Sequence, residues 1–395
     1  MRTLANQDFT DRRAIVRVDF NVPIDDDFQV TDATRIKAAK ETIDYILSQG
    51  GSCVLISHLG RPKGKDPRLS LSHIVSKVEE ILQVPVSFFA DCVGTAAEQA
   101  AASIASGSVI LMENLRFYKE ETSGDFDFAE SLSRMGDCYV NDAFGTAHRA
   151  HASTTIMAQF FKQDKFFGIL LEKEVTSIEK VMKSGEKPVL AILGGAKVSS
   201  KITIIENMLD KIDHLIIGGG MVYTFAKAQG GIVGQSICED EYCDYALEFL
   251  EKAKAKNVQV HLPIDVIVAD NFSNDANQKI CKVGEIPDDW EGLDAGPQTL
   301  DKFQHVVMQS KTILWNGPLG VFEFENFSKG TITLGEYIAK STAAGAFSLV
   351  GGGDSVAAVK QFGFEDKMSY ISTGGGAMLE SLEGKTLPGI AALLE

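Results

Sequence analysis

Short runs of β-branched and aromatic residues alternate along the chain with longer segments whose apolar residues recur at helical spacing. From Thr34 to Ser48 apolar residues recur every three or four positions and two glycines follow, which predicts an amphipathic helix. Because strands separated by helices form parallel sheets with right-handed crossovers, the alternation predicts an α/β fold of doubly wound sheets. The predicted strands cover residues 14–18, 53–56, 86–89, 109–112 and 138–140 in the first half, and 189–193, 214–218, 258–262, 312–315, 347–350 and 369–372 in the second.

The length of the chain favours two domains. Its 395 residues exceed what one hydrophobic core usually supports. The segment LLEKEVTSIEKVMKSGEKP (170–188) reads as one long helix that ends near Gly185 and Pro188, and a new strand–helix series follows it. We therefore predict two doubly wound, Rossmann-like parallel-sheet domains, residues 1–168 and 169–376, joined by this long helix.

Composition excludes several classes of protein. A net charge of −16 argues against a nucleic-acid or membrane surface, and no apolar run approaches the roughly 20 residues that span a membrane. The N-terminus lacks the apolar core of a signal peptide. Six scattered cysteines without a C-x-x-C pair fit free thiols in a reducing compartment. We expect a cytoplasmic protein with no nucleic-acid or membrane partner.

Two polar clusters in the first half begin where apolar runs end, VRVDFNVP (16–23) and SHLGRPKG (57–64). Ligands bind at strand ends in α/β sheets, and arginine forks grip phosphate or carboxylate. Either cluster alone could be a solvated loop, but on consecutive strands they predict one site for a small, multiply anionic, hydroxylated ligand. This set comprises Asp19, Asn21, Arg35, His58 and Arg61.

Two later strand ends extend the cationic set. Arg116 follows the strand at 109–112, and Arg149 follows the strand at 138–140 between His148 and His151. The two histidines could suggest zinc, but no cysteine or third histidine accompanies them and the arginine would repel a cation. Contact with an anion is therefore the favoured interpretation.

In the second half, five strands run directly into glycine-rich turns, at 193–201, 217–223, 315–323, 350–355 and 372–377. Glycine after a strand lets backbone N–H groups approach a phosphate or a purine. One such turn is weak evidence, but five at one sheet edge predict a nucleotide site. The chain contains neither a G-x-x-x-x-G-K-[ST] loop nor the G-x-G-x-x-G fingerprint of dinucleotide-binding proteins.

Three charged residues beside these turns sharpen the prediction. Lys197 and Lys201 are four apart at a predicted helix start, which would put them on one face as point charges for phosphate oxygens. Asp354 follows three glycines at a strand end, where a carboxylate suits Mg²⁺ shared with a nucleotide or, alternatively, a helix N-cap.

Phosphoryl transfer joins an anion site to a nucleotide and metal site, because it requires positioning and neutralisation of charge by Lys, Arg and Mg²⁺. No Asp or His stands out as a general base. An acceptor already ionised at neutral pH, such as a carboxylate, needs none. Two rivals remain: a dinucleotide-dependent oxidoreductase, which would need the missing fingerprint, and a non-catalytic nucleotide sensor, which would not need the cationic half-site.

Nine motifs, taken together and in order, resemble the phosphoglycerate kinase family along essentially the whole chain. They are VRVDFNVP, SHLGRP, ENLRFYKEE, NDAFGTAHRAHAS, GGAKVSSKI, IIGGGM, WNGPLGVFE, GGGDS and STGGGA. The resemblance implies transfer of a phosphoryl group between 1,3-bisphosphoglycerate and ADP, giving 3-phosphoglycerate and MgATP, in glycolysis and gluconeogenesis. It also implies a monomer whose C-terminal segment, 377–395, packs back on the first domain.

The resemblance assigns roles to individual residues. It implies 3-phosphoglycerate binding by Asp19, Asn21, Arg35, His58, Arg61, Arg116 and Arg149. It implies ATP or ADP binding by Gly195, Ala196, Lys197, Lys201, Gly219, Gly292, Asn316, Pro318, Glu323, Gly351, Gly352, Gly353, Asp354 and Ser355. Catalytic roles fall to Arg35, Lys197 and Gly375, and Asp354 serves the metal.

Two positions depart from the family pattern. Ser355 stands where many members have threonine, which keeps the hydroxyl, and Phe167 occupies a usually small position at the start of the interdomain helix. Phe167 therefore bears on hinge packing and not on chemistry. Since the two half-sites are predicted on different domains, we expect a hinge closure around 165–185 when both ligands are bound.

Overall fold

The computed structural model describes residues 1–394, which form two compact units. Unit 1 comprises residues 1–175 and the C-terminal residues from 386, and unit 2 comprises Thr176–Lys385. The division lies within helix α6 (Ile169–Met182), a few residues after the predicted boundary at 168/169. The predicted C-terminal segment began at 377, whereas residues 377–385 belong to unit 2, and residue 395 lies outside the described residues.

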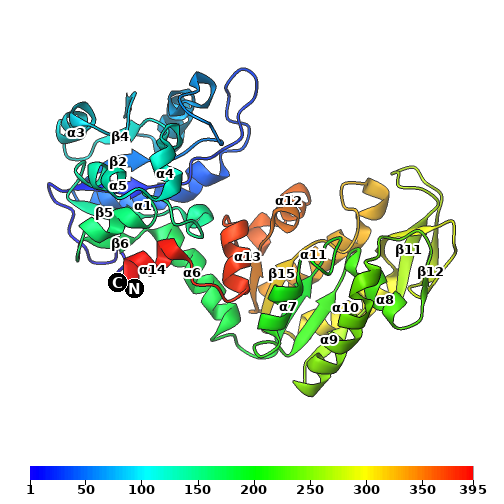
Figure 1. The fold of residues 1–395 in the computed structure, drawn as a ribbon. Coiled ribbons are helices and arrows are strands. Elements are labelled where there is room, and N and C mark those ends of the chain that lie inside the picture. Colours follow the sequence, from blue (N-terminus) through cyan, green and yellow to red (C-terminus); the bar gives the residue numbers. More distant parts are fainter. Residues whose placement is uncertain (395) are drawn as a thin grey trace. The chain divides into compact units, whose positions relative to one another are not determined.

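Unit 1 is built on a six-stranded sheet in the order β3-β4-β2-β1-β5-β6, with every pair parallel (Figure 1). The strands are β1 (Arg13–Arg17), β2 (Ser52–Ile56), β3 (Val86–Phe89), β4 (Val109–Met112), β5 (Cys138–Asn141) and β6 (Lys165–Phe167). The helices are α1 (Thr34–Ser48), α2 (Val75–Leu82), α3 (Thr95–Ala102), α4 (Lys119–Ser123), α5 (Phe126–Ser133) and α14 (Pro388–Leu394). Five predicted strands and helix 34–48 are confirmed, and the three-residue strand β6 was missed. Helix α14 lies beside β6, where Lys165 Nζ donates to Ala392 O at 2.8 Å.

Unit 2 repeats the plan with the parallel order β10-β8-β7-β15-β16-β17. Its strands are β7 (Val189–Leu193), β8 (His214–Ile217), β10 (Gln259–His261), β15 (Thr312–Asn316), β16 (Phe347–Val350) and β17 (Tyr370–Ile371). Its helices are α7 (Ile202–Met208), α8 (Met221–Ala228), α9 (Cys243–Ala255), α10 (Pro297–Gln309), α11 (Lys329–Ala343), α12 (Gly353–Gln361) and α13 (Gly376–Leu382). The α/β class and the parallel sheets agree with the prediction.

Two small sheets in unit 2 were not predicted. One is antiparallel, in the order β12 (Gln278–Lys282), β11 (Asp265–Ala269) and β14 (Glu291–Ala295), and the other pairs β9 (Ile232–Val233) with β13 (Glu285–Ile286). Strand β12 is almost wholly exposed, so it shows no apolar alternation to read. These strands also do not alternate with helices, and the prediction relied on that alternation.

The topology of each large sheet indicates where a ligand can bind. In unit 1 strand β1 lies between β2 and β5, and in unit 2 strand β7 lies between β8 and β15, so the strand order reverses at these positions. Crevices at the carboxyl ends of strands beside such a reversal are where α/β proteins bind ligands.

None of the helices in residues 1–394 has the length and apolar character to cross a membrane. All six cysteines carry free thiols, as predicted.

Two buried carboxyls should make stability depend on pH. Asp142 Oδ1 accepts hydrogen bonds from Leu170 N (3.0 Å) and Leu171 N (3.3 Å) at the start of α6, and Asp294 accepts from Gly330 N (2.7 Å). Burial raises the pKa of Asp142 and of Asp294 to about 7 each. Between about pH 4 and pH 7 the folded chain therefore binds more protons than the unfolded chain, and stability falls as pH rises through this window.

We expect the free energy of unfolding to decrease from pH 5 to pH 8, with each carboxyl contributing at most about 1.4 kcal/mol per pH unit. Asp142→Asn and Asp294→Asn, which stay neutral, should each flatten the slope. Urea unfolding at several pH values would measure it. A slope unchanged in both variants would show that these carboxyls are ionised throughout.

Candidate functional site

A cavity of about 500 Å³ opens at the carboxyl ends of β1, β2, β4 and β5 in unit 1. All seven residues predicted to bind the anionic substrate line it: Asp19, Asn21, Arg35, His58, Arg61, Arg116 and Arg149. His148 and His151, favoured as anion contacts, line it too. Sequence reasoning missed other lining residues, among them Lys63, Tyr118, Lys119, Thr122 and Thr146. The structure thus gathers one strongly cationic pocket from four separate strand ends.

Backbone and carboxylate groups hold the pocket's first loops in place. Arg35 Nη1 donates to Asn21 O at 2.7 Å and lies 3.4 Å from Asp19 Oδ2. The Asn21 side chain accepts a hydrogen bond from Gly60 N at 2.8 Å, which joins the loop after β1 to the loop after β2. Asp19 and Asn21 therefore orient Arg35 while leaving part of its guanidinium accessible, since the side chain is 36% exposed.

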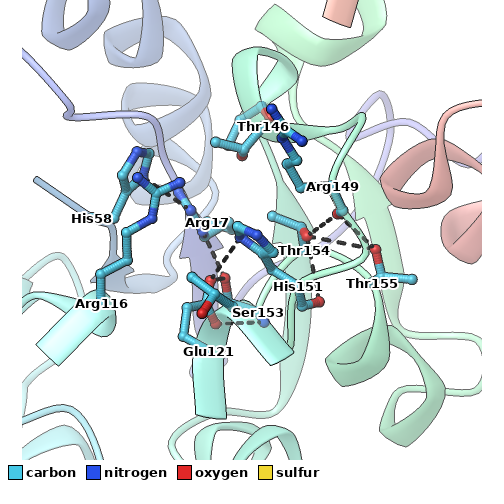
Figure 2. A network of polar contacts seen from close by, with 12 residues as sticks. Arg17, His58, Arg116, Glu121, Thr146, Arg149, His151, Ser153, Thr154 and Thr155 are labelled. Carbon is cyan, nitrogen blue, oxygen red and sulfur yellow. Dashed lines mark hydrogen bonds and ion pairs between the residues drawn. The ribbon is translucent and has the colours of Figure 1, made fainter. Parts of the chain in front are cut away.

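A buried polar network of Arg17, Ser153 and Glu121 lies next to the pocket residue His58 (Figure 2). Arg17 is fully buried, and its Nε donates to Ser153 Oγ at 2.8 Å. Ser153 Oγ donates in turn to Glu121 Oε1 at 2.6 Å. Arg17 Nη2 lies 3.2 Å from His58 Nδ1. Sequence reasoning did not identify Arg17, Glu121 or Ser153. An arginine inside the apolar strand AIVRV was nevertheless a signal that its charge has a partner.

The pocket's positive field comes from arginines and lysines, because His58 and His151 are neutral. Burial and, less strongly, the charge of Arg17 lower the pKa of His58 well below its ordinary value. Burial and, less strongly, the charge of Arg116 lower the pKa of His151 to about 4. Burial and, less strongly, the charge of Arg17 lower the pKa of Arg116 to about 10. Like charges raise each other's free energy here, and a bound anion would relieve that repulsion.

One donor in this cluster lacks a hydrogen-bond partner. Arg116 Nη1 donates to Gly60 O at 2.8 Å, but its Nε is buried and has no hydrogen-bond partner among residues 1–394. A buried guanidinium N–H without an acceptor is costly. An anion in the cavity would supply acceptor oxygens to this cationic wall.

A second cavity, of about 640 Å³, lies at the strand ends of unit 2. Seven of the predicted nucleotide-binding residues line it: Gly195, Ala196, Gly219, Gly292, Pro318, Glu323 and Asp354. Its other walls are largely apolar and include Tyr223, Ile237, Phe272, Leu293, Leu319 and Phe324. An apolar cleft with glycine backbone on one side and a carboxylate at its edge suits a nucleotide whose phosphates lie along the glycines.

Glycines make this cavity possible by letting backbones meet. Gly219 has φ +64°, and a Cβ there would lie 2.7 Å from the backbone N and O of Gly195. At Gly292 a Cβ would lie 1.9 Å from the Tyr223 hydroxyl. Any larger residue would therefore close the cavity or push its walls apart.

The remaining predicted nucleotide residues do not line this cavity. Lys201 Nζ donates to Asn316 Oδ1, and Asn316 Nδ2 donates to Gly351 O at 2.9 Å. Gly317 N donates to Ser355 Oγ at 2.5 Å. These bonds link the loops after β7, β15 and β16 into one polar network. Outside the cavity lining are Lys197, Lys201, Asn316, Gly351, Gly352, Gly353 and Ser355, and Gly375, which precedes α13 at φ +47°.

The predicted helical pairing of Lys197 with Lys201 is wrong. Helix α7 begins at Ile202, so both lysines precede it, and Lys197 is exposed on a loop. Glu239 holds that loop out of the helix, because its carboxylate accepts from Ser199 N (3.0 Å) and Ser199 Oγ (2.6 Å).

The N-cap alternative for Asp354 is also excluded. Gly352 is the N-cap of α12, and Asp354 stands in the first turn with an exposed carboxylate. Burial lowers the pKa of Lys201, and Asp354 partly offsets this, so the carboxylate acts on the lysine's charge. An exposed carboxylate of this kind is a suitable ligand for Mg²⁺.

The chain is similar to known proteins over its whole length. A family model described as phosphoglycerate kinase matches residues 4–385. Phosphoglycerate kinase of Porphyromonas gingivalis is 53% identical over 415 aligned positions, covering 99% of both chains. The cytosolic phosphoglycerate kinase of Nicotiana tabacum is 49% identical, covering 99% of this chain and 97% of its own. The structure of phosphoglycerate kinase from Coxiella burnetii is 40% identical with a TM-score of 0.91, covering 99% and 98%.

Proposed function

The chain belongs to the phosphoglycerate kinase family, and we propose from this premise how its residues divide the work of a kinase that acts in glycolysis. The family's reaction transfers a phosphoryl group between 1,3-bisphosphoglycerate and ADP, giving 3-phosphoglycerate and ATP. In this proposal unit 1 binds the phosphoglycerate and unit 2 binds the nucleotide. The protein acts as a cytoplasmic monomer on small molecules, without a nucleic-acid or membrane partner.

The observation that carries the proposal is the gathering of all seven predicted anion-binding residues around one cavity. Arg61, Arg116 and Arg149 provide planar N–H donors for phosphate or carboxylate oxygens. Asp19 and Asn21 can accept a hydrogen bond from the ligand's hydroxyl group or position Arg35. The mutual repulsion of Arg17, Arg61 and Arg116 supports an anionic ligand independently of any resemblance.

Residues of unit 2 fit a nucleotide with a metal. Apolar walls, including Leu319 and Phe324, suit the adenine, and the Gly195–Ala196 backbone suits the phosphates. Asp354 would hold Mg²⁺, because its carboxylate is exposed at the cavity wall and caps no helix. When bound with the nucleotide, Mg²⁺ neutralises phosphate charge.

The chain's own cations do the rest of the chemistry. Arg35 and Lys197 neutralise the moving phosphoryl group, while Lys201, held by Asn316, orients nucleotide phosphate. Gly375, the N-cap residue of α13, contributes its backbone groups to the catalytic site. The acceptor carboxylate is ionised at neutral pH, so no residue needs to remove a proton.

A coupled assay tests the proposed function. Purified protein with ATP, Mg²⁺ and 3-phosphoglycerate should form an acyl phosphate, detected by a reducing enzyme that consumes it together with a nicotinamide cofactor. Absorbance change without the coupling enzyme would indicate an oxidoreductase instead. Nucleotide binding without turnover would indicate a sensor.

We expect Arg61→Ala and Arg149→Ala to separate the two half-sites. Each loses a charged donor of the anion pocket, so 3-phosphoglycerate binding should weaken by about 1.5–3 kcal/mol. Calorimetric ATP affinity should barely change, because neither arginine belongs to unit 2. Arg134→Ala, an exposed arginine outside the cavity, is the matched control. Equal losses for both ligands would contradict this division of labour.

We also propose a hinge closure, because in-line transfer requires reacting atoms about 3–3.5 Å apart while both ligands must be able to enter. The helix α6 connects the units. Small-angle scattering should show a smaller radius of gyration in the ternary complex than in the apo or singly liganded protein. An unchanged radius in an active sample would require a preformed site.

A further inference from the structure

Two thiols and a carboxylate converge in unit 2 outside the nucleotide cavity. Cys238, Asp240 and Cys243 place one ligand atom each within 4.8 Å of the other two, and no other such group of three occurs in residues 1–394. Cys238 precedes a 3₁₀ turn at Asp240–Tyr242, and Cys243 is the first residue of α9. The sequence pattern C-x-D-x-x-C matches no standard metal motif, so the fold and not the spacing brings the three together.

The local geometry suits a metal ion better than it suits three independent groups. Cys238 Sγ lies 3.3 Å from Asp240 Oδ1, and both thiols remain partly accessible. Each thiol also makes a long contact of 3.9 Å to a carbonyl of α8, Cys238 to Tyr223 O and Cys243 to Thr224 O. A thiol is a weak hydrogen-bond donor, whereas its thiolate is a strong ligand for borderline-soft ions.

We propose that Cys238, Asp240 and Cys243 form a site for a thiophilic divalent cation of the zinc class. Two thiolates and one carboxylate supply three tetrahedral ligands, and water takes the fourth position. On binding, each thiol releases its proton to solvent and forms a sulfur–metal bond, so no electron transfer is involved. Hard Mg²⁺ avoids sulfur ligands, so the site is distinct in chemistry from that at Asp354.

The surroundings balance the charge of such a centre. Two thiolates and a carboxylate around a divalent ion leave one net negative charge. Lys227 Nζ lies 2.8 Å and 2.9 Å from the two oxygens of Asp240, and it can remain on one oxygen while the other binds the ion. A partner of this kind orients a ligating carboxylate and tunes the site.

The position of the site connects it to the nucleotide cavity. The segment 236–239 directly precedes the turn, and Ser236 Oγ accepts from Gly292 N at 2.9 Å. Ile237 lines the cavity, and Glu239 holds Ser199 of the loop that carries Lys197. An ion bound at the turn would therefore fasten this segment to α9 and stabilise unit 2.

Cobalt titration of the reduced protein tests the proposal, with a non-thiol reductant and excess Mg²⁺ present. We expect one Co²⁺ per chain with the near-ultraviolet charge-transfer absorption of thiolate ligands, and displacement by Zn²⁺. Cys238→Ser and Cys243→Ser should each abolish that absorption, and Asp240→Asn should keep it while weakening Co²⁺ affinity about 10- to 100-fold. Cys281→Ser, a partly exposed thiol elsewhere in unit 2, is the control and should bind as the parent does.

A second readout does not depend on spectroscopy. Zn²⁺ should raise the urea midpoint of the parent and of Cys281→Ser, but not of the Cys238→Ser and Cys243→Ser variants. Far-ultraviolet circular dichroism of the metal-free variants checks that they fold. Cobalt uptake without thiolate absorption, or absorption that survives both serine variants, would overturn the proposal. Loss of two hydrogens per chain on mild oxidation, without metal uptake, would also overturn it by assigning the pair to a disulfide.

Discussion

Replacing Lys197 with alanine should lower turnover by about 10²- to 10³-fold, equivalent to about 2.7–4 kcal/mol of lost transition-state stabilisation. Lys197 is exposed on the loop between β7 and α7 and does not line the cavity that fits the nucleotide. Its charge can therefore act on the moving phosphoryl group without carrying the ground-state affinity for ADP. Steady-state kinetics with calorimetric ADP binding would measure both quantities.

Two variants make this experiment selective. Lys254→Ala removes an exposed lysine from α9 and should leave turnover unchanged. Lys197→Arg keeps the charge and should restore part of the rate, which a purely structural loop residue would not show. Near-normal turnover of Lys197→Ala would remove this lysine from the mechanism, and a parallel loss of ADP affinity would make it a binding residue.

The sequence alone predicted the parts of the molecule that follow simple periodicity. Parallel strands are buried on both faces and read as short apolar runs, as in β2, where all five residues are buried. Because the carboxyl ends of such strands meet at one edge, residues far apart in the chain, such as Asp19 and Arg149, could be assigned to one site. The glycine-rich turns of unit 2 could also be assigned to one sheet edge, because each directly follows such a strand.

Interactions that join distant segments were not predictable in this way. No periodicity indicates that Arg17, Glu121 and Ser153 form one network, because they lie in a strand, a short helix and a loop. The sequence around Lys197 predicted the start of a helix. In the structure this segment is a loop, held by a hydrogen bond from Ser199 N to the carboxylate of Glu239, 40 residues away. Neither the exposed strand β12 nor the meeting of Cys238 with Cys243 leaves a pattern in the sequence.

Glu121→Gln should destabilise unit 1 by about 3 kcal/mol or more, since it leaves buried charge without a counter-charge. Glu121 is fully buried, and its carboxylate accepts from Ser153 N (3.0 Å) and Ser153 Oγ (2.6 Å). Its negative charge favours the charged form of Arg116 and stands across the Ser153 hydroxyl from Arg17. The neighbouring Glu120→Gln, at a partly exposed side chain, is the matched control.

The distribution of tryptophans makes this effect assignable to one unit. Both tryptophans, Trp290 and Trp315, lie in unit 2. In urea, Glu121→Gln should shift the transition seen by circular dichroism, while the tryptophan fluorescence transition reports whether unit 2 is unaffected. Saturating 3-phosphoglycerate should recover much of the lost stability, because a bound anion supplies the negative charge that the substitution removes. A variant as stable as its control would show that the arginines of this pocket do not depend on Glu121.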